Sequence, residues 1–206
     1  MTVADSGRIV VLNGVSRSGK SSIAKAMQEV LSGVWMNLGM DAHKACTPPR
    51  MQPGVGLRPG ANQVSREIED RVPVLYAALY ESIAAHARLG LDVVADVYHH
   101  EQYSVPRGIL ADCASRLAGL PALFVGVRCP LHVIWKRREA TWGQVPGSVD
   151  AGVIAAVELG QAAVHTHGSY DLEVDTSILS PVECAERIGD RLAHGPPGSR
   201  FTELAK

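Results

Sequence analysis

Cysteine is scarce in this sequence, and the few that occur stand far apart. No two of them form a C-x-x-C pair; they are Cys46, Cys113, Cys129 and Cys184. A disulfide framework or a cysteine-based zinc site depends on closely spaced cysteines, so neither is expected here. The favoured interpretation is a set of buried, reduced thiols in a cytoplasmic protein.

An excess of charge and a long apolar run are also missing. Lysine and arginine number 20 against 21 acidic residues, so no basic surplus exists to bind nucleic acid. No stretch reaches the roughly 18 apolar residues of a membrane helix. The first residues carry Asp5 and Arg8 ahead of a very short apolar run, unlike a signal peptide. We expect a cytoplasmic protein that binds neither nucleic acid nor membranes. A homo-oligomer is compatible with the sequence, which does not fix the oligomeric state.

The chain does contain a regular alternation of two patterns. Short runs rich in β-branched residues predict strands over 8–12, 34–38, 91–97, 122–127 and 170–174. Helical spacing of apolar residues predicts helices over 21–31, 73–89, 106–117, 131–140, 149–164 and 181–192. This order predicts an α/β fold with a five-stranded parallel sheet and helices on both faces. One domain should span 1–194, followed by a flexible tail over 195–206 that holds two prolines and two glycines.

A phosphate-binding loop joins the first strand to the first helix. The stretch from Gly14 to Ser21 fits G-x-x-x-x-G-K-[ST] and has a strand before it and a helix after it. Glycines let backbone N–H groups converge on phosphate oxygens, and the helix dipole points at the same place. A glycine turn with a surface lysine is the weaker alternative. The nucleotide-binding residues expected here are Gly14, Ser16, Ser18, Gly19, Lys20, Ser21 and Ser22.

Charged residues follow the other predicted strands directly. Ligands of open α/β sheets lie beyond the carboxyl ends of the strands, so Asp41, Asp96, Arg128 and Asp175 should meet at one edge. Ser21 and Asp96 would hold Mg²⁺, unless Asp96 only caps the next turn. Asp41 could orient an acceptor hydroxyl and take its proton, or could instead cap a short helix.

Five segments, in order, resemble the chloramphenicol phosphotransferase family: IVVLNGVSRSGKSS, WMNLGMDAHKACTPPRMQ, VVADV, LFVGVRC and QAAVHTHGSYDLEVDTS. The resemblance implies a P-loop kinase fold, ATP as donor and an antibiotic hydroxyl as acceptor. It implies that Asp41 is the catalytic aspartate and that Lys20 and Ser21 bind the donor. Asp96 matches the second of two acids at the family's third strand, and Ala95 replaces the first.

The resemblance also implies a lid and an adenine site. The lid should span 136–148, where Arg137 or Arg138 would stabilise charge on the transferring phosphoryl group. The alternative is that both arginines lie on a solvated helix face. Trp142 replaces a second family arginine. Asp175 and Thr176 match the segment beside the adenine, although a plain strand-to-helix turn uses the same residue types.

The acceptor pocket should lie between Asp41 and the loop over 48–66, which is rich in proline and glycine. The candidate acceptor contacts are Met51, Arg58, Gln63, Arg66, Tyr76 and His99. Tyr76 also fits a helical core stripe, and His99 lacks the partners of a metal site.

The sequence therefore predicts an ATP- and Mg²⁺-dependent O-phosphotransferase of a small hydroxylated molecule, and the family resemblance indicates an antibiotic that it inactivates. A metabolite kinase acting on a sugar, a nucleoside or a shikimate-like acid is one alternative. A nucleotide-binding regulator that transfers nothing is the other.

Overall fold

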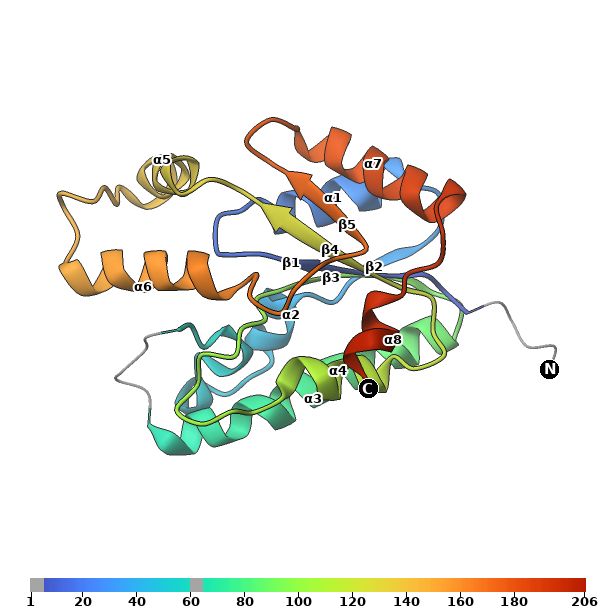
Figure 1. Ribbon diagram of the computed structural model, residues 1–206, viewed down its shortest axis with the longest axis horizontal. Helices are drawn as coiled ribbons and strands as arrows, with labels where there is room; N and C mark the ends of the chain where they lie inside the picture. The colour runs from blue at the N-terminus through green and yellow to red at the C-terminus, as the bar shows by residue number, and fades with distance from the viewer. Residues whose placement is uncertain (1–5, 60–64) are drawn as a thin grey trace.

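The computed structural model describes residues 6–59 and 65–206. Its centre is a parallel sheet of five strands in the order β2-β3-β1-β4-β5 (Figure 1). The strands are β1 (Ile9–Asn13), β2 (Trp35–Asn37), β3 (Asp92–Val97), β4 (Ala122–Arg128) and β5 (Leu172–Asp175). The expected α/β fold is confirmed. Because all the strands run the same way, their carboxyl ends meet at one edge of the sheet.

Both faces of the sheet are covered, which explains why the central strands read as unbroken apolar runs. Every residue of β1 is fully buried. On one face, Val10 and Leu12 pack against α1 (Lys20–Val30) and α7 (Pro181–His194). On the other face, Ile9 and Val11 pack against α3 (Arg66–Arg88) and α4 (Ile109–Arg116). Figure 1 shows these two layers above and below the sheet.

Three helices lie at the carboxyl-end side of the sheet. The short helix α2 (Met40–Ala45) follows β2 directly. The helices α5 (Leu131–Trp142) and α6 (Ala151–Ala163) follow β4 and extend beyond its end (Figure 1). Two 3₁₀ turns, η1 (Pro49–Met51) and η2 (Gly54–Gly56), organise part of the proline- and glycine-rich loop. Gln63 and the rest of 60–64 lie outside the described residues.

The start of α3 corrects the predicted boundary. We expected a helix from Pro73, but α3 begins at Arg66 and carries Pro73 inside it. The Ser65 hydroxyl accepts a hydrogen bond from the Ile68 N–H, at 3.4 Å, and caps the first turn. Burial of Val72 and Tyr76 on the same face stabilises the helix across the proline.

The expectation of a flexible C-terminal tail is wrong for residues 200–204. They form α8 (Arg200–Leu204), which places Phe201 in the core with 4% exposure. The Phe201 ring contacts Phe124 of β4 and Tyr80 of α3, with centroids 4.9 and 6.3 Å apart. The N–H groups of Ser199 and Arg200 also donate to Asp171, at 2.8 and 3.2 Å, so packing and hydrogen bonds together hold this segment on the core.

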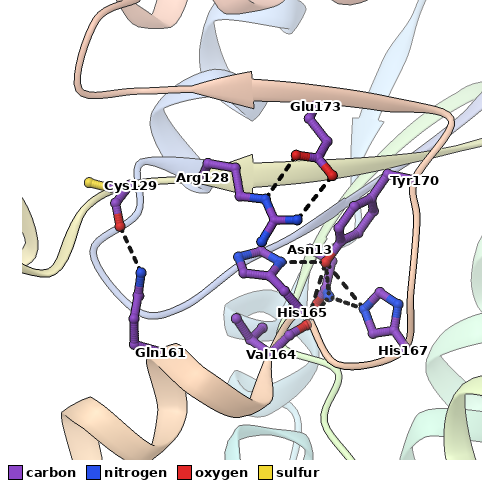
Figure 2. Close-up of polar contacts among 9 residues, drawn as sticks. All are labelled: Asn13, Arg128, Cys129, Gln161, Val164, His165, His167, Tyr170 and Glu173. Atoms are coloured by element: carbon purple, nitrogen blue, oxygen red, sulfur yellow. Dashed lines mark hydrogen bonds and ion pairs between the residues drawn. The ribbon is translucent and has the colours of Figure 1, made fainter.

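A buried asparagine fixes the end of β1, where the phosphate loop begins. Asn13 donates from Nδ2 to the Val164 carbonyl at 3.0 Å and to the Tyr170 hydroxyl at 3.1 Å. Its Oδ1 accepts from the His99 N–H at 2.8 Å. His165 contacts the same Tyr170 hydroxyl at 2.6 Å (Figure 2). These bonds tie the loop's entry strand to the end of α6 and to the segment after β3.

Because His99 is buried, we expect the protein to lose stability as the pH falls. Burial lowers the pKa of His99 to about 3, whereas the unfolded side chain titrates near 6.5. Between these values only the unfolded chain binds the proton, so the free energy of unfolding falls as pH falls. The slope from this group reaches about 1.4 kcal/mol per pH unit. Urea unfolding at pH 7.5, 6.5, 5.5 and 4.5 measures it. His99→Gln should give a shallower pH dependence, and equal slopes would contradict this assignment.

Candidate active site

The phosphate loop opens onto a cavity of about 680 Å³, the main cavity, at the carboxyl ends of the strands. Gly19 precedes α1 with φ 99°, and no side chain caps the first turn of this helix. The N–H groups of that turn are thus available to an anion. Arg17, in the same loop, has φ 69°, a conformation that costs free energy and concentrates at functional sites. Ser16, Ser21 and Ser22 line the cavity, whereas Ser18 is buried beneath the loop.

Lys20 is held inside the loop. It is 7% exposed, and its Nζ donates to the carbonyls of Gly14 at 2.7 Å and Val15 at 2.8 Å. Burial lowers the pKa of Lys20 to about 8, while the charges of Asp96 and Asp41 oppose this shift. A phosphate in the cavity would replace the two carbonyls as a stronger, charged partner for the ammonium.

Ser21 and Asp96 meet as expected for a magnesium site. The Ser21 hydroxyl donates to Asp96 Oδ2 at 2.6 Å, and both residues line the main cavity. Asp96 therefore faces α1, and the alternative that it caps its own following turn is not what the structure shows. No group of three acidic, histidine or cysteine side chains that could hold a metal occurs among residues 6–59 and 65–206. Mg²⁺ needs only one or two protein ligands when phosphates supply the rest, so Ser21 and Asp96 fit it.

The side chain of Asp96 lies so close to residue 39 that only glycine fits there. A Cβ at residue 39 would lie 1.7 Å from Asp96 Oδ1 and 2.9 Å from the Asp96 nitrogen. We expect Gly39→Ala to displace this carboxylate, to remove the Mg²⁺ dependence of nucleotide binding and to cost about 1–3 kcal/mol of stability. Calorimetric titration with and without Mg²⁺, together with urea unfolding, measures both effects. Gly147→Ala is the matched control, because its Cβ meets nothing within 4 Å.

Asp41 lies on the wall of the same cavity as Lys20 and Asp96. It occupies the first turn of α2, whose N-cap is Gly39 and which has no side-chain cap. The alternative of Asp41 as a helix cap is therefore wrong. Its exposed carboxylate can meet a small molecule that enters the cavity from solvent.

The two arginines expected in the lid, Arg137 and Arg138, both lie on α5 and point to different places. Arg137 lines the main cavity and donates to the Arg17 carbonyl at 3.1 Å, the Thr176 hydroxyl at 3.0 Å and the Thr176 carbonyl at 2.6 Å. Thr176 in turn donates to the Ser18 carbonyl at 2.6 Å. Arg137 thus joins α5 to the phosphate loop and to the turn after β5, and it does not lie on a solvated face.

Arg138 is buried on the other side of α5 with 4% exposure. It donates to Gln144 Oε1 at 2.7 Å and lines a second cavity of about 280 Å³. Its guanidinium lies over the rings of Trp135 and Trp142, at 5.3 and 5.0 Å. Arg17 covers the Trp142 ring as well, at 3.8 Å. Trp142 therefore connects α5 to the phosphate loop by cation–π contacts.

Not all of the expected strand-end residues face the site. Arg128 turns outward and pairs with Glu173 at 2.9 Å (Figure 2). Asp175 accepts from the Ser177 N–H at 2.8 Å and lines a separate cavity beside α6. The expected place of Asp175 beside the nucleotide is therefore not supported, whereas Thr176 lines the main cavity.

Of the residues expected to contact the acceptor, some line a cavity and others do not. Arg58 lines both cavities. Met51 lines neither of them, and Arg66, with 82% side-chain exposure, pairs with Asp70 on the surface of α3.

The assignments of Tyr76 and His99 to the acceptor are corrected. Tyr76 is 1% exposed, and its hydroxyl donates to the carbonyls of Val55 at 3.1 Å and Tyr98 at 3.2 Å. His99 is 2% exposed and contacts the Tyr80 hydroxyl at 2.8 Å. Both belong to the core, as the helical spacing of Tyr76 allowed.

Four residues that line the two cavities were not predicted from the sequence. Tyr98, Lys44 and Arg17 line the main cavity, and Gln144 lines the second one. Arg17 carried a signal, because it stands inside the phosphate-loop motif. The others are placed by tertiary packing alone.

Known proteins resemble this chain over nearly its whole length. Two proteins from two strains of Mycobacterium tuberculosis, each named as a candidate O-phosphotransferase, are 27% identical over 97% of this chain and 88% of their own length. No helix in the described part of the chain is long and apolar enough to span a membrane.

Solved structures show the same fold. The tunicamycin resistance protein of Deinococcus radiodurans has a TM-score of 0.59 at 20% identity, covering 93% of this chain and 99% of its own. A gluconokinase of Sinorhizobium meliloti has a TM-score of 0.57 at 22% identity, covering 92% and 93%. The APS kinase of M. tuberculosis, in complex with AMPPNP and APS, has a TM-score of 0.59 at 19% identity, covering 91% and 98%. The family model described as "Chloramphenicol phosphotransferase-like protein" matches residues 7–193, and the chain belongs to this family of phosphotransferases.

Proposed function

We propose that this protein transfers the γ-phosphoryl group of ATP, with Mg²⁺, to a hydroxyl of a small molecule. The observation that carries the proposal is that one cavity holds two sets of groups. Lys20, Ser21 and Asp96 suit a nucleotide and its Mg²⁺, and the exposed carboxylate of Asp41 lines the same cavity. A nucleotide switch needs only the nucleotide-binding groups. A kinase also needs a group that orients an acceptor and takes its proton, and Asp41 supplies one.

The roles follow from position. The phosphate loop and Lys20 hold the phosphates, while Arg137 stands at the loop where charge develops. Mg²⁺ at Ser21 and Asp96 would neutralise phosphate charge. Asp41 orients the acceptor hydroxyl and accepts its proton, as the bond to ADP breaks and a phosphorus–oxygen bond to the acceptor forms.

The acceptor class is the next question. The family's description and the fold shared with a tunicamycin resistance protein support an antibiotic acceptor, whose phosphorylation would inactivate it. The fold is equally that of kinases of ordinary metabolites.

ADP release in the presence of Mg²⁺ and ATP tests the proposal. Panels of hydroxylated antibiotics and of sugars, nucleosides and hydroxy acids are added separately. We expect at least one compound to raise the rate at least tenfold over the basal ATPase rate. Tight ATP binding with no acceptor-stimulated turnover in either panel would indicate a regulator instead.

A further inference from the structure

A second cavity adjoins the main one and has a different chemistry. Its volume is about 280 Å³, and it shares Ser16, Arg58 and Tyr98 with the main cavity. It lies between the phosphate loop, α5 and α6. No acidic residue is among the ten that line it. Five of the ten are aliphatic: Val15, Ile134, Val153, Ala156 and Val157.

A buried cation without a counter-ion faces this cavity. Arg138 is 96% buried and donates to the neutral amide of Gln144, and among the described residues its Nε has no hydrogen-bond partner. Within residues 6–59 and 65–206, no carboxylate lies within 4.0 Å of Arg138, Arg58 or Arg17. Three half-buried arginines elsewhere in this range do pair with carboxylates: Arg107, Arg116 and Arg128.

The positive charges around Arg138 make its buried charge still less favourable. Burial lowers the pKa of Arg138, and the positive charges of Arg58 and Arg17 lower it further. An unpaired buried cation costs free energy that an anion bound beside it would offset. The cation–π contacts with Trp135 and Trp142 offset only part of this free energy, since each contributes about 0.5–2 kcal/mol.

The phosphates of the nucleotide are poorly placed to be that anion. Arg17, Arg58 and Arg137 line the main cavity together with Lys20, whereas Arg138 lines the second cavity and not the main one. The unpaired charge thus faces the compartment beyond the phosphate loop, with apolar walls around it.

We propose that the acceptor carries an anionic group, a carboxylate or another oxyanion, which binds Arg138 and Arg58 in the second cavity. Its carbon skeleton packs against the apolar wall, and its hydroxyl reaches Asp41 in the adjoining cavity. This inference rests on the proposed function, because it names the class of that enzyme's acceptor. It favours a hydroxylated acid over a neutral antibiotic.

Binding is tested without catalysis, on protein loaded with Mg²⁺ and a non-hydrolysable ATP analogue, so that the phosphate loop is filled. The probes are matched pairs at constant ionic strength: benzoate with benzamide, and shikimate with its methyl ester. Thermal shifts give the affinities. We expect the acid of at least one pair to bind at least tenfold more tightly than its neutral partner.

Arg58→Met and Arg138→Met should each weaken acid binding by about 10- to 100-fold, the loss of a charge-assisted hydrogen bond. Arg88→Met, an exposed arginine at the end of α3, is the matched control and should change nothing. Arg138→Lys keeps the charge, and Arg58 is exposed, so one informative variant remains if Arg138→Met fails to fold.

Equal affinity for acid and neutral probes, or no binding in any pair, would overturn the anion site. Acid binding that survives both methionine variants would overturn the assignment to Arg58 and Arg138. Transfer of phosphate to neutral acceptors in preference to acids would also contradict this inference while leaving the proposed function intact. Arginine-dependent acid binding without transfer to any acceptor would overturn the proposed function alone.

Discussion

Asp41→Asn should lower acceptor phosphorylation by about 10³-fold, within the 10²- to 10⁴-fold range of a lost general base. The amide has nearly the same shape as the carboxylate, but it does not accept the hydroxyl proton. Because Asp41 is exposed in the first turn of α2 and caps no helix, folding should be unaffected. Binding of Mg²⁺ and ATP should stay within about threefold, because Lys20 and Ser21 are unchanged.

Single-turnover transfer from labelled ATP measures this effect, and calorimetry measures the nucleotide affinity. Asp190→Asn, on the exposed face of α7, controls for the loss of one negative charge. If Asp41→Asn transferred phosphate as fast as the parent, the proton acceptor would have to be another group.

Lys20→Met should weaken ATP binding by about 10- to 100-fold, because a charge-assisted hydrogen bond contributes about 1.5–3 kcal/mol. In the parent protein Lys20 is 7% exposed and its ammonium lies within 2.8 Å of two loop carbonyls, so it is held at the loop that would bind the phosphates. Methionine keeps an apolar side chain and removes the ammonium with its charge and its N–H donors.

Fluorescence titration with an ATP analogue gives the dissociation constants. Lys25→Met is the matched control, since this lysine lies on the same helix with 76% side-chain exposure. A loss of affinity equal in the two variants would point to net charge alone and would remove the special role of Lys20.

The central strands and the phosphate loop could be predicted because their signals are local. β1 is buried on both faces and has no polar side chain before Asn13, so its apolar run stands out. The glycines and Lys20 of the loop are adjacent in the chain, and so are the strand before them and the helix after them. Asp41 and Asp96 were predictable from topology, because parallel strands bring their carboxyl ends together.

The rest of the site depends on which way side chains turn, and no local pattern carries that information. Arg137 and Arg138 are neighbours in sequence, yet one faces the phosphate loop and the other faces the second cavity. Tyr76 and His99 were plausible pocket residues by position, but packing of α3 against β3 buries both. Phe201 ordered a tail whose composition alone indicated flexibility.

The second cavity as a whole could not be predicted from the sequence, although Arg58 and Arg138, which line it, were candidate site residues. Ile134 and Val157 come from two helices that follow β4, while Arg58 comes from the loop after β2. Such a convergence of distant segments is visible only in the folded chain. It bears directly on specificity, because the acceptor's shape and charge must match this space.

The most direct measurement follows the γ-phosphoryl group itself. The protein is incubated with Mg²⁺, ATP labelled with ¹⁸O in the γ-phosphoryl group, and the mixed panels of hydroxylated antibiotics and metabolites. Mass spectrometry then follows every compound. We expect one acceptor to gain a single labelled phosphoryl group in the parent protein and not in Asp41→Asn. Label that appears only in inorganic phosphate, or that stays in ATP with every panel, would contradict a small-molecule phosphotransferase.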